Sequence, residues 1–285
     1  MNLLPLALAM SLTVSALPAS GLPALPEPAP ITTSVSSEAG QPVTYEARLP
    51  ILMYHHVVPD GQPCNEMTVT VGRLEQDLRW LSEHGYRTVL PRELAAGEPL
   101  PEKPILITFD DGYRSNYDLA YPLLQKYSAK AAIAIMVYMP DNWAEAFLSW
   151  DMCREMSASG LVEIGSHGFA IHNLDDERMG NFVPGRANGV QRQQGEPDDA
   201  FESRVLRDLL QSYERIALET GTPPTYFAYP FGKTDPDADA YLQSLFPVTA
   251  VTGPGTQSAD LSGGLHGLPR FTVTMKAAPK TFLET

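Results

Sequence analysis

Two adjacent carboxylates, Asp110 and Asp111, follow the short apolar segment Pro104–Phe109. The segment is rich in β-branched and aromatic residues and is bounded by proline and glycine, which predicts a buried strand. Neighbouring side chains on a strand point to opposite faces, but Gly112 lets the chain turn so that both acids can face one cavity. Two acids so placed repel each other unless a cation or a proton lies between them. The alternative is a solvated Asp-Asp-Gly turn at the surface.

Two histidines, His167 and His172, follow a second predicted strand, 161–165. Five residues of separation would turn them about 140° apart on a helix and place them on opposite faces of a strand. They can converge only from a loop, which Gly165 and Gly168 permit.

Two imidazoles and one carboxylate make a plausible three-ligand metal site with open positions for water. Asp111 would supply the carboxylate ligand beside His167 and His172. Asp110 would then lie next to the ion without binding it, where it could take a proton from the bound water.

The elements that must position these residues are predicted from apolar periodicity. Strands are predicted at 50–58, 86–90, 104–109, 131–137, 161–165, 226–229, 248–251 and 268–273, and helices at 73–84, 114–127, 143–159, 200–220 and 237–245. Such alternation without a break in composition indicates an α/β fold, a distorted (β/α) barrel of seven or eight strands in a single catalytic domain. The chemistry of such barrels lies at the carboxyl ends of the strands, where both polar motifs are found.

The N-terminal region has a different composition. Residues 1–19 contain an apolar segment followed by small residues, which predicts a signal peptide and a secreted or periplasmic protein, with a short membrane anchor as the alternative. Residues 20–48 are rich in proline, alanine and serine and are predicted to form a flexible tether to a domain at 49–285.

The overall charge excludes some partners. A net charge of −14 and an isoelectric point near 4.8 argue against nucleic acid or an anionic membrane surface. No internal apolar run is long enough to span a bilayer. Cys64 and Cys153 lie in no Cys-x-x-Cys pair, and the sequence leaves their pairing undecided.

Three segments in order, Thr108–Tyr113, Ser166–His172 and Ala228–Gly232, resemble the motifs of the polysaccharide deacetylase family with its NodB-homology domain. The resemblance covers about residues 50–275, with the NodB-homology core at about 103–285. The six-residue stretch from His to His and the Tyr-His pair in Met53–Val57 are most similar to the poly-β-1,6-N-acetylglucosamine N-deacetylase branch.

The resemblance implies one divalent metal ion held by Asp111, His167 and His172, with zinc expected and cobalt, nickel or iron as alternatives. It implies that Asp110 is the base that activates the attacking water. A divalent cation lowers the pKa of a bound water and polarises an amide oxygen, which agrees with that chemistry.

By the same resemblance, Tyr229, Pro230 and Phe231 contact the substrate. A backbone N–H of Phe231 or Tyr229 would stabilise the oxyanion, since Pro230 has none, and the aromatic rings would wall the acetyl pocket.

Two family features are absent from their usual places. Relatives often have an arginine shortly before the Pro-aromatic pair, and here Arg270 on the last strand is the candidate replacement, with a surface or barrel-bottom ion pair as the alternative. Relatives also place the histidine that acts as general acid late in the chain, where this sequence has His266 in a glycine-rich stretch. In the branch that this chain resembles, that histidine is moved to the early strand, which favours His55 over both His266 and His56.

The predicted function is metal-dependent removal of N-acetyl groups from an extracytoplasmic amino-sugar polysaccharide, with an Asp base and a His acid. One alternative is hydrolysis of another C–N bond, in a small amide or a formylated amino sugar. The other is a glycan-binding relative without catalysis, which would be expected to lack Asp110 or a histidine.

Overall fold

The described part of the computed structural model comprises residues 43–172, 189–253 and 258–283. The predicted signal peptide and the tether up to residue 42 lie outside it. Residues 43–48 pack onto the domain: the Tyr45 hydroxyl donates to the Leu94 carbonyl at 3.0 Å, and β1 (Arg48–Leu49) pairs with β11 (Ala259–Asp260). The domain therefore begins earlier than residue 49, and the end of the predicted tether is part of it.

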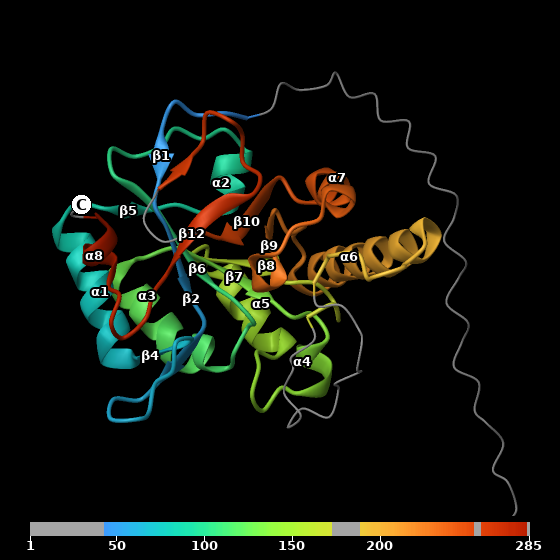
Figure 1. Ribbon diagram of the computed structural model, residues 1–285. Coiled ribbons are helices and arrows are strands. Elements are labelled where there is room, and N and C mark those ends of the chain that lie inside the picture. Colours follow the sequence, from blue (N-terminus) through green and yellow to red (C-terminus); the bar gives the residue numbers. More distant parts are fainter. Residues whose placement is uncertain (1–42, 173–188, 254–257, 284–285) are drawn as a thin grey trace, which may run out of the picture. The chain divides into compact units, whose positions relative to one another are not determined.

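Parallel strands of the described chain close into a seven-stranded barrel (Figure 1). In pairing order they are β2 (Ile51–Tyr54), β12 (Leu268–Thr272), β10 (Val248–Thr252), β9 (Tyr226–Ala228), β8 (Val162–Ser166), β7 (Ala131–Ile135) and β6 (Pro104–Phe109), which pairs again with β2. An eighth strand, β5 (Arg87–Thr88), pairs with the beginning of β6. Only Ser166 and Phe227 join β8 to β9, so the barrel is distorted there. The predicted (β/α) barrel of seven or eight strands is confirmed.

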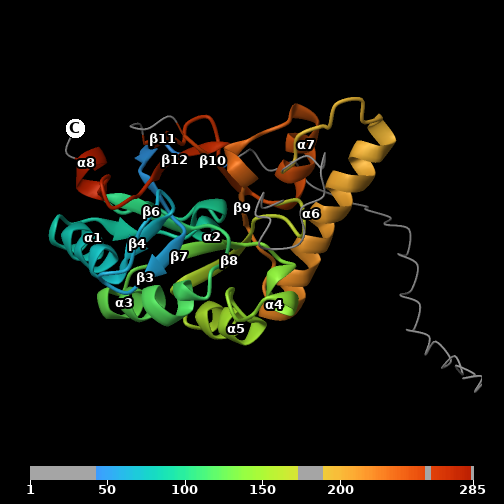
Figure 2. The same cartoon turned by 60° about the horizontal axis from the view of Figure 1, so that its bottom comes forward.

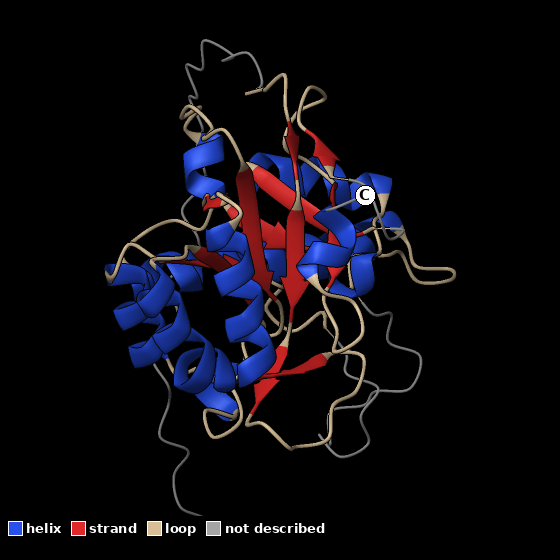
Figure 3. Cartoon of the chain, turned by 90° about the vertical axis from the view of Figure 1, so that its left-hand side faces the viewer, coloured by secondary structure: helices blue, strands red, loops and turns tan. Residues whose placement is uncertain are grey.

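Helices cover the outside of the barrel (Figures 2 and 3). The longer ones are α1 (Val71–Glu83), α3 (Tyr121–Tyr127), α5 (Trp150–Ala158), α6 (Asp198–Thr220) and α7 (Pro236–Leu245), and the shorter ones are α2 (Pro91–Ala95), α4 (Met139–Asn142) and α8 (Pro279–Leu283). A π-helical turn, η1 (Asn116–Ala120), precedes α3, and a 3-10 turn, η3 (Pro230–Gly232), follows β9. A small parallel pair, β3 (His56–Val58) and β4 (Thr68–Thr70), extends from the end of β2. None of the described helices is both long and apolar enough to span a bilayer.

Two of the predicted elements differ most from the structure. The helix predicted at 143–159 begins only at Trp150, because Ser149 caps it by accepting the Met152 N–H at 3.3 Å. The strand predicted at 50–58 is interrupted at His55, which separates β2 from β3. Both cysteines are free, so Cys64 and Cys153 form no disulfide.

Strand alternation divides the core into an outer and an inner layer. On β6, Ile107 and Phe109 belong to a cluster with residues of α1, α3 and α5, whereas Leu106 belongs to a cluster with residues of β7, β9 and β10. The inward positions of β6 continue through Thr108 to Asp110. The barrel therefore presents its polar residues where these inward rows reach the carboxyl ends of the strands.

Candidate active site

Asp110 and Arg270 form a buried ion pair inside the barrel. The Nη1 and Nη2 atoms of Arg270 donate to Oδ1 and Oδ2 of Asp110, each at 2.7 Å. Nη1 also lies 3.2 Å from Thr108 Oγ1 and 3.2 Å from the Tyr226 hydroxyl oxygen. Arg270 is 1% exposed. The structure therefore places Arg270 on the acid that it was expected to support, and not in a surface or barrel-bottom ion pair.

This ion pair keeps Asp110 ionised. Burial by itself raises the pKa of Asp110, but the positive charge of Arg270, with smaller contributions from His167 and His55, holds that pKa well below its usual range. A carboxylate in this state can accept a proton but has none to donate at neutral pH.

Asp111 comes to the same side of the barrel as Asp110 through an unusual backbone conformation. Its φ angle of 70° is left-handed, and Gly112 follows with φ 75°. A Cβ atom on Gly112 would lie 2.8 Å from Ile135 Cγ2, so glycine is required there by contact as well as by conformation. Left-handed non-glycine residues cost about 1–3 kcal/mol and gather at functional sites. The turn lets Asp111 face inward with Asp110, although the two are neighbours in sequence.

Asp111, His167 and His172 offer ligand atoms that all lie within 4.8 Å of one another. Asp111 Oδ1 is 3.6 Å from His167 Nε2 and 3.7 Å from His172 Nε2. These separations exceed the N–H···O range of about 2.7–3.2 Å. They are close to the distance of about 3.4 Å between two ligands of one tetrahedral zinc ion.

Both imidazoles are neutral, which is the protonation state that binds a metal. Burial lowers the pKa of His167 and that of His172 to about 4, so each ring is neutral near pH 7. His167 Nδ1 lies 2.8 Å from the Ala228 carbonyl oxygen and donates to it, which leaves the lone pair on Nε2. His172 Nδ1 is buried and has no hydrogen-bond partner among the described residues. The donor set of two nitrogens and one carboxylate oxygen fits a divalent metal ion such as zinc.

Of the candidate acids, His55 lies near Asp110 and His172, and His266 does not. His55 follows Ile51 and Met53 in the inward row of β2, and its charge influences the pKa values of Asp110 and His172. His266 is exposed and precedes β12, at the end of the barrel opposite the carboxyl ends of the strands.

Tyr229 was predicted to wall the acetyl pocket with its ring and was one of two candidates for the oxyanion N–H, and the structure contradicts both predictions. Its ring points outward between β9 and the helices, where the hydroxyl donates to Asp239 Oδ1 at 2.7 Å. Its backbone N–H is used in the sheet, donating to the Ala250 carbonyl at 2.9 Å. Strand alternation decides this outcome, because Tyr229 continues the outward row of Phe227.

Phe231 is the remaining N–H donor of this segment. It has a left-handed φ angle of 59°, and its ring stacks on His172 with 4.5 Å between the centroids. Phe231 is 47% exposed, so its ring covers His172 from the solvent side. Among the described residues, no acceptor bonds the Phe231 N–H. The peptide following Pro230 can therefore donate to a bound molecule.

Two residues that hold the backbone of the site were not predicted from the sequence. Asn116 donates from Nδ2 to the His55 carbonyl at 2.8 Å, and Asp208 accepts hydrogen bonds from the loop between His167 and His172. Neither had a sequence signal, because Asp208 lies within a helix-like pattern and Asn116 follows the motif at no distinctive spacing.

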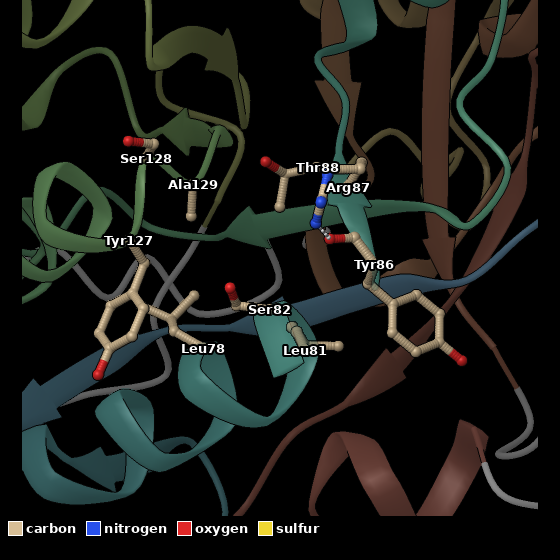
Figure 4. Close-up of a pocket in the computed structure, with 9 residues that line it drawn as sticks. All are labelled: Leu78, Leu81, Ser82, Tyr86, Arg87, Thr88, Tyr127, Ser128 and Ala129. Carbon is tan, nitrogen blue, oxygen red and sulfur yellow. Dashed lines mark hydrogen bonds between the residues drawn. The ribbon is translucent and has the colours of Figure 1, made fainter. Parts of the chain in front are cut away.

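A separate depression of about 290 Å³ lies between α1, β5 and the end of α3 (Figure 4). It is lined by Leu78, Leu81, Ser82, Tyr86, Arg87, Thr88, Tyr127, Ser128 and Ala129. This lining contains no histidine and no carboxylate, so it lacks the groups for the chemistry described above.

Comparison with known proteins agrees with this geometry. The family model for polysaccharide deacetylase matches residues 97–247. The poly-β-1,6-N-acetyl-D-glucosamine N-deacetylase of Escherichia coli K12 is 27% identical over 255 residues, covering 82% of this chain and 38% of that protein. YxkH of Bacillus subtilis, named as a polysaccharide deacetylase, is 30% identical over 235 residues, covering 80% of this chain and 72% of YxkH. This chain thus spans well under half the length of the E. coli relative.

Solved structures show the same fold. A de-N-acetylase from Aggregatibacter actinomycetemcomitans superposes with a TM-score of 0.67 at 26% identity, covering 83% of this chain and all of that one. IcaB from Ammonifex degensii gives 0.66 at 25% identity, covering 82% of this chain and 94% of that one. The match of the family model to more than half of the sequence, together with this fold, shows that the chain belongs to the polysaccharide deacetylase family.

Proposed function

We propose that this protein is a metal-dependent hydrolase that removes N-acetyl groups from an extracytoplasmic amino-sugar polysaccharide of the poly-β-1,6-N-acetylglucosamine type. The observation that carries the proposal is the set Asp111, His167 and His172 beside the ionised Asp110 in a chain of this family. Three ligands leave coordination positions open, as in catalytic zinc sites and not in structural ones.

A divalent ion at the three ligands would polarise the acetyl carbonyl and lower the pKa of the attacking water. Asp110 is the base that takes the proton of that water, and Arg270 holds both of its oxygens in place. The N–H of Phe231 stabilises the negative charge that develops on the carbonyl oxygen. His55 donates a proton to the departing amine.

A relative supports the proposed substrate class. The E. coli poly-β-1,6-N-acetyl-D-glucosamine N-deacetylase matches 82% of this chain, which supports a β-1,6-linked N-acetylglucosamine polymer as substrate. The N-terminal signal pattern supports action outside the cytoplasm, in the periplasm or after secretion. Recovery of mature protein outside the cytoplasm, with an N-terminus near residue 17 or 20, would agree with this location.

The direct test is acetate release by purified, metal-loaded protein from β-1,6-linked N-acetylglucosamine oligomers, with chitooligosaccharides and formylated glucosamine as comparison substrates. The proposal predicts that the β-1,6-linked oligomers are the preferred substrates. Preference for the formylated sugar would indicate hydrolysis of another C–N bond. Binding of oligomers without any acetate release would indicate a glycan-binding relative.

A further inference from the structure

The stretch from Ser166 to His172 is hydrogen-bonded to α6 through two side chains of that helix. Asp208 Oδ1 accepts the Phe169 N–H and Oδ2 accepts the Ala170 N–H, each at 2.7 Å. One turn further along α6, the Ser212 hydroxyl lies 2.9 Å from the Ser166 hydroxyl. Helix α6 therefore contacts both the residue before His167 and the middle of the loop that leads to His172.

This loop needs external support because its conformation is irregular. Gly168 has φ 88°, and a Cβ atom there would lie 2.5 Å from Ile171 Cγ1. On one side, the carbonyls of Gly168 and Phe169 accept the backbone N–H groups of Val137 and Tyr138 at 3.0 and 3.1 Å. On the other side, the N–H groups of Phe169 and Ala170 depend on a side chain, the carboxylate of Asp208.

We propose that Asp208 is a positioning residue of the metal centre, which sets the separation of His167 and His172 by holding the backbone between them. Asp208 is 9% exposed, so water competes poorly for the two N–H groups. This assignment rests on the proposed metal centre and adds to it a residue that binds no ion itself. Loss of a group that orients a metal ligand typically lowers metal affinity about 10- to 100-fold.

The test measures the affinity of the full-length protein for Co²⁺ by competition with a chelator, together with the Co²⁺ absorption spectrum and the thermal unfolding midpoint of the metal-free protein. Asp208→Ala removes both acceptors, and Asp208→Asn keeps the size but leaves one acceptor oxygen. Two variants on the same helix are controls. Glu214→Gln removes an exposed negative charge, and Ile216→Val weakens the packing of a buried residue outside the loop.

Both Asp208 variants are expected to bind Co²⁺ about 10- to 100-fold more weakly than the parent, with an altered absorption spectrum. Glu214→Gln is expected to resemble the parent, and Ile216→Val to unfold at a lower temperature with unchanged affinity. Parent-like affinity and spectrum in both Asp208 variants would overturn the assignment and leave the metal centre intact. A parent protein that binds no Co²⁺ would overturn the metal centre itself, and this assignment with it.

Discussion

Asp110 and Asp111 are adjacent in sequence and chemically identical, but the structure gives them different contacts. Both carboxylate oxygens of Asp110 accept hydrogen bonds from Arg270. By contrast, Oδ1 of Asp111 lies near the Nε2 atoms of two histidines. The left-handed backbone at Asp111 produces this difference by turning the second acid away from the strand direction.

Alanine at Asp111, His167 or His172 is expected to lower bound metal and acetate release together, because each residue supplies one of three ligand atoms. Metal content by mass spectrometry and activity on the same preparation check this. His84→Ala, an exposed histidine, is the matched control and should keep both. Full metal occupancy in purified His167→Ala would contradict the ligand assignment.

Asp110→Asn is expected to retain the metal and lose turnover, with the loss in kcat, because in the proposed mechanism it removes a base and not a ligand. General bases contribute a factor of about 10²–10⁴, so a loss of that size is expected. If Asp110→Asn instead strips the metal, the roles of the two carboxylates are exchanged.

His55→Ala is expected to keep the metal and lose acetate release by about 10²–10⁴-fold, while His266→Ala stays near the parent rate. The physical reason is placement, since His55 lies close enough to influence Asp110 and His172 and His266 lies at the other end of the barrel. Initial rates under saturating metal distinguish the two variants. The opposite result would move the general acid to His266.

At the residue scale, the sequence predicted the groups that lie on inward rows of strands or directly at their ends. It failed for Tyr229, where the family motif suggested a role but strand alternation turns the side chain outward. It also left the role of Arg270 open, because the bond to Asp110 joins residues 160 positions apart. A contact between residues so far apart in sequence cannot be predicted from the local pattern of residue types.

At the scale of elements, the barrel strands were predictable because buried parallel strands form short apolar runs. Around the barrel the strands follow chain order, except that β5, in the strand predicted at 86–90, lies outside the ring because β2 pairs directly with β6. The irregular parts were not predicted. Residues 143–149 look helical in sequence, but Phe147 forms a bridge with Tyr113, a tertiary contact that overrides local propensity.

The turn after β6 gives a test at this scale. Gly112→Ala is expected to destabilise the protein by about 1–3 kcal/mol, because it adds a Cβ against Ile135 at a left-handed position. Gly263→Ala is the control, since its Cβ would meet no atom within 4 Å. Chemical denaturation of the metal-free proteins measures both, and equal stability of the two variants would show that the turn tolerates a side chain.

At the scale of the whole molecule, strands from both ends of the chain meet at one site. β2 and β12 are neighbours in the barrel although they lie near opposite ends of the domain, and this brings His55 and Arg270 to the cluster of Asp111, His167 and His172. The closed barrel is therefore the reason that residues from 55 to 270 can act together. The E. coli relative is much longer, so the activity of this chain must be measured on this chain.

The central claim, that a single metal ion at Asp111, His167 and His172 is required for deacetylation, is tested most directly by metal removal and stepwise return. The protein is stripped with a chelator, and acetate release from a β-1,6-linked N-acetylglucosamine oligomer is followed as Zn²⁺ or Co²⁺ is added. Activity is expected to be absent from the stripped protein and to rise in proportion to added metal until it saturates at one ion per chain, as one three-ligand site requires. Full activity of the stripped protein, or no recovery on adding metal to protein that remains folded, would contradict the claim.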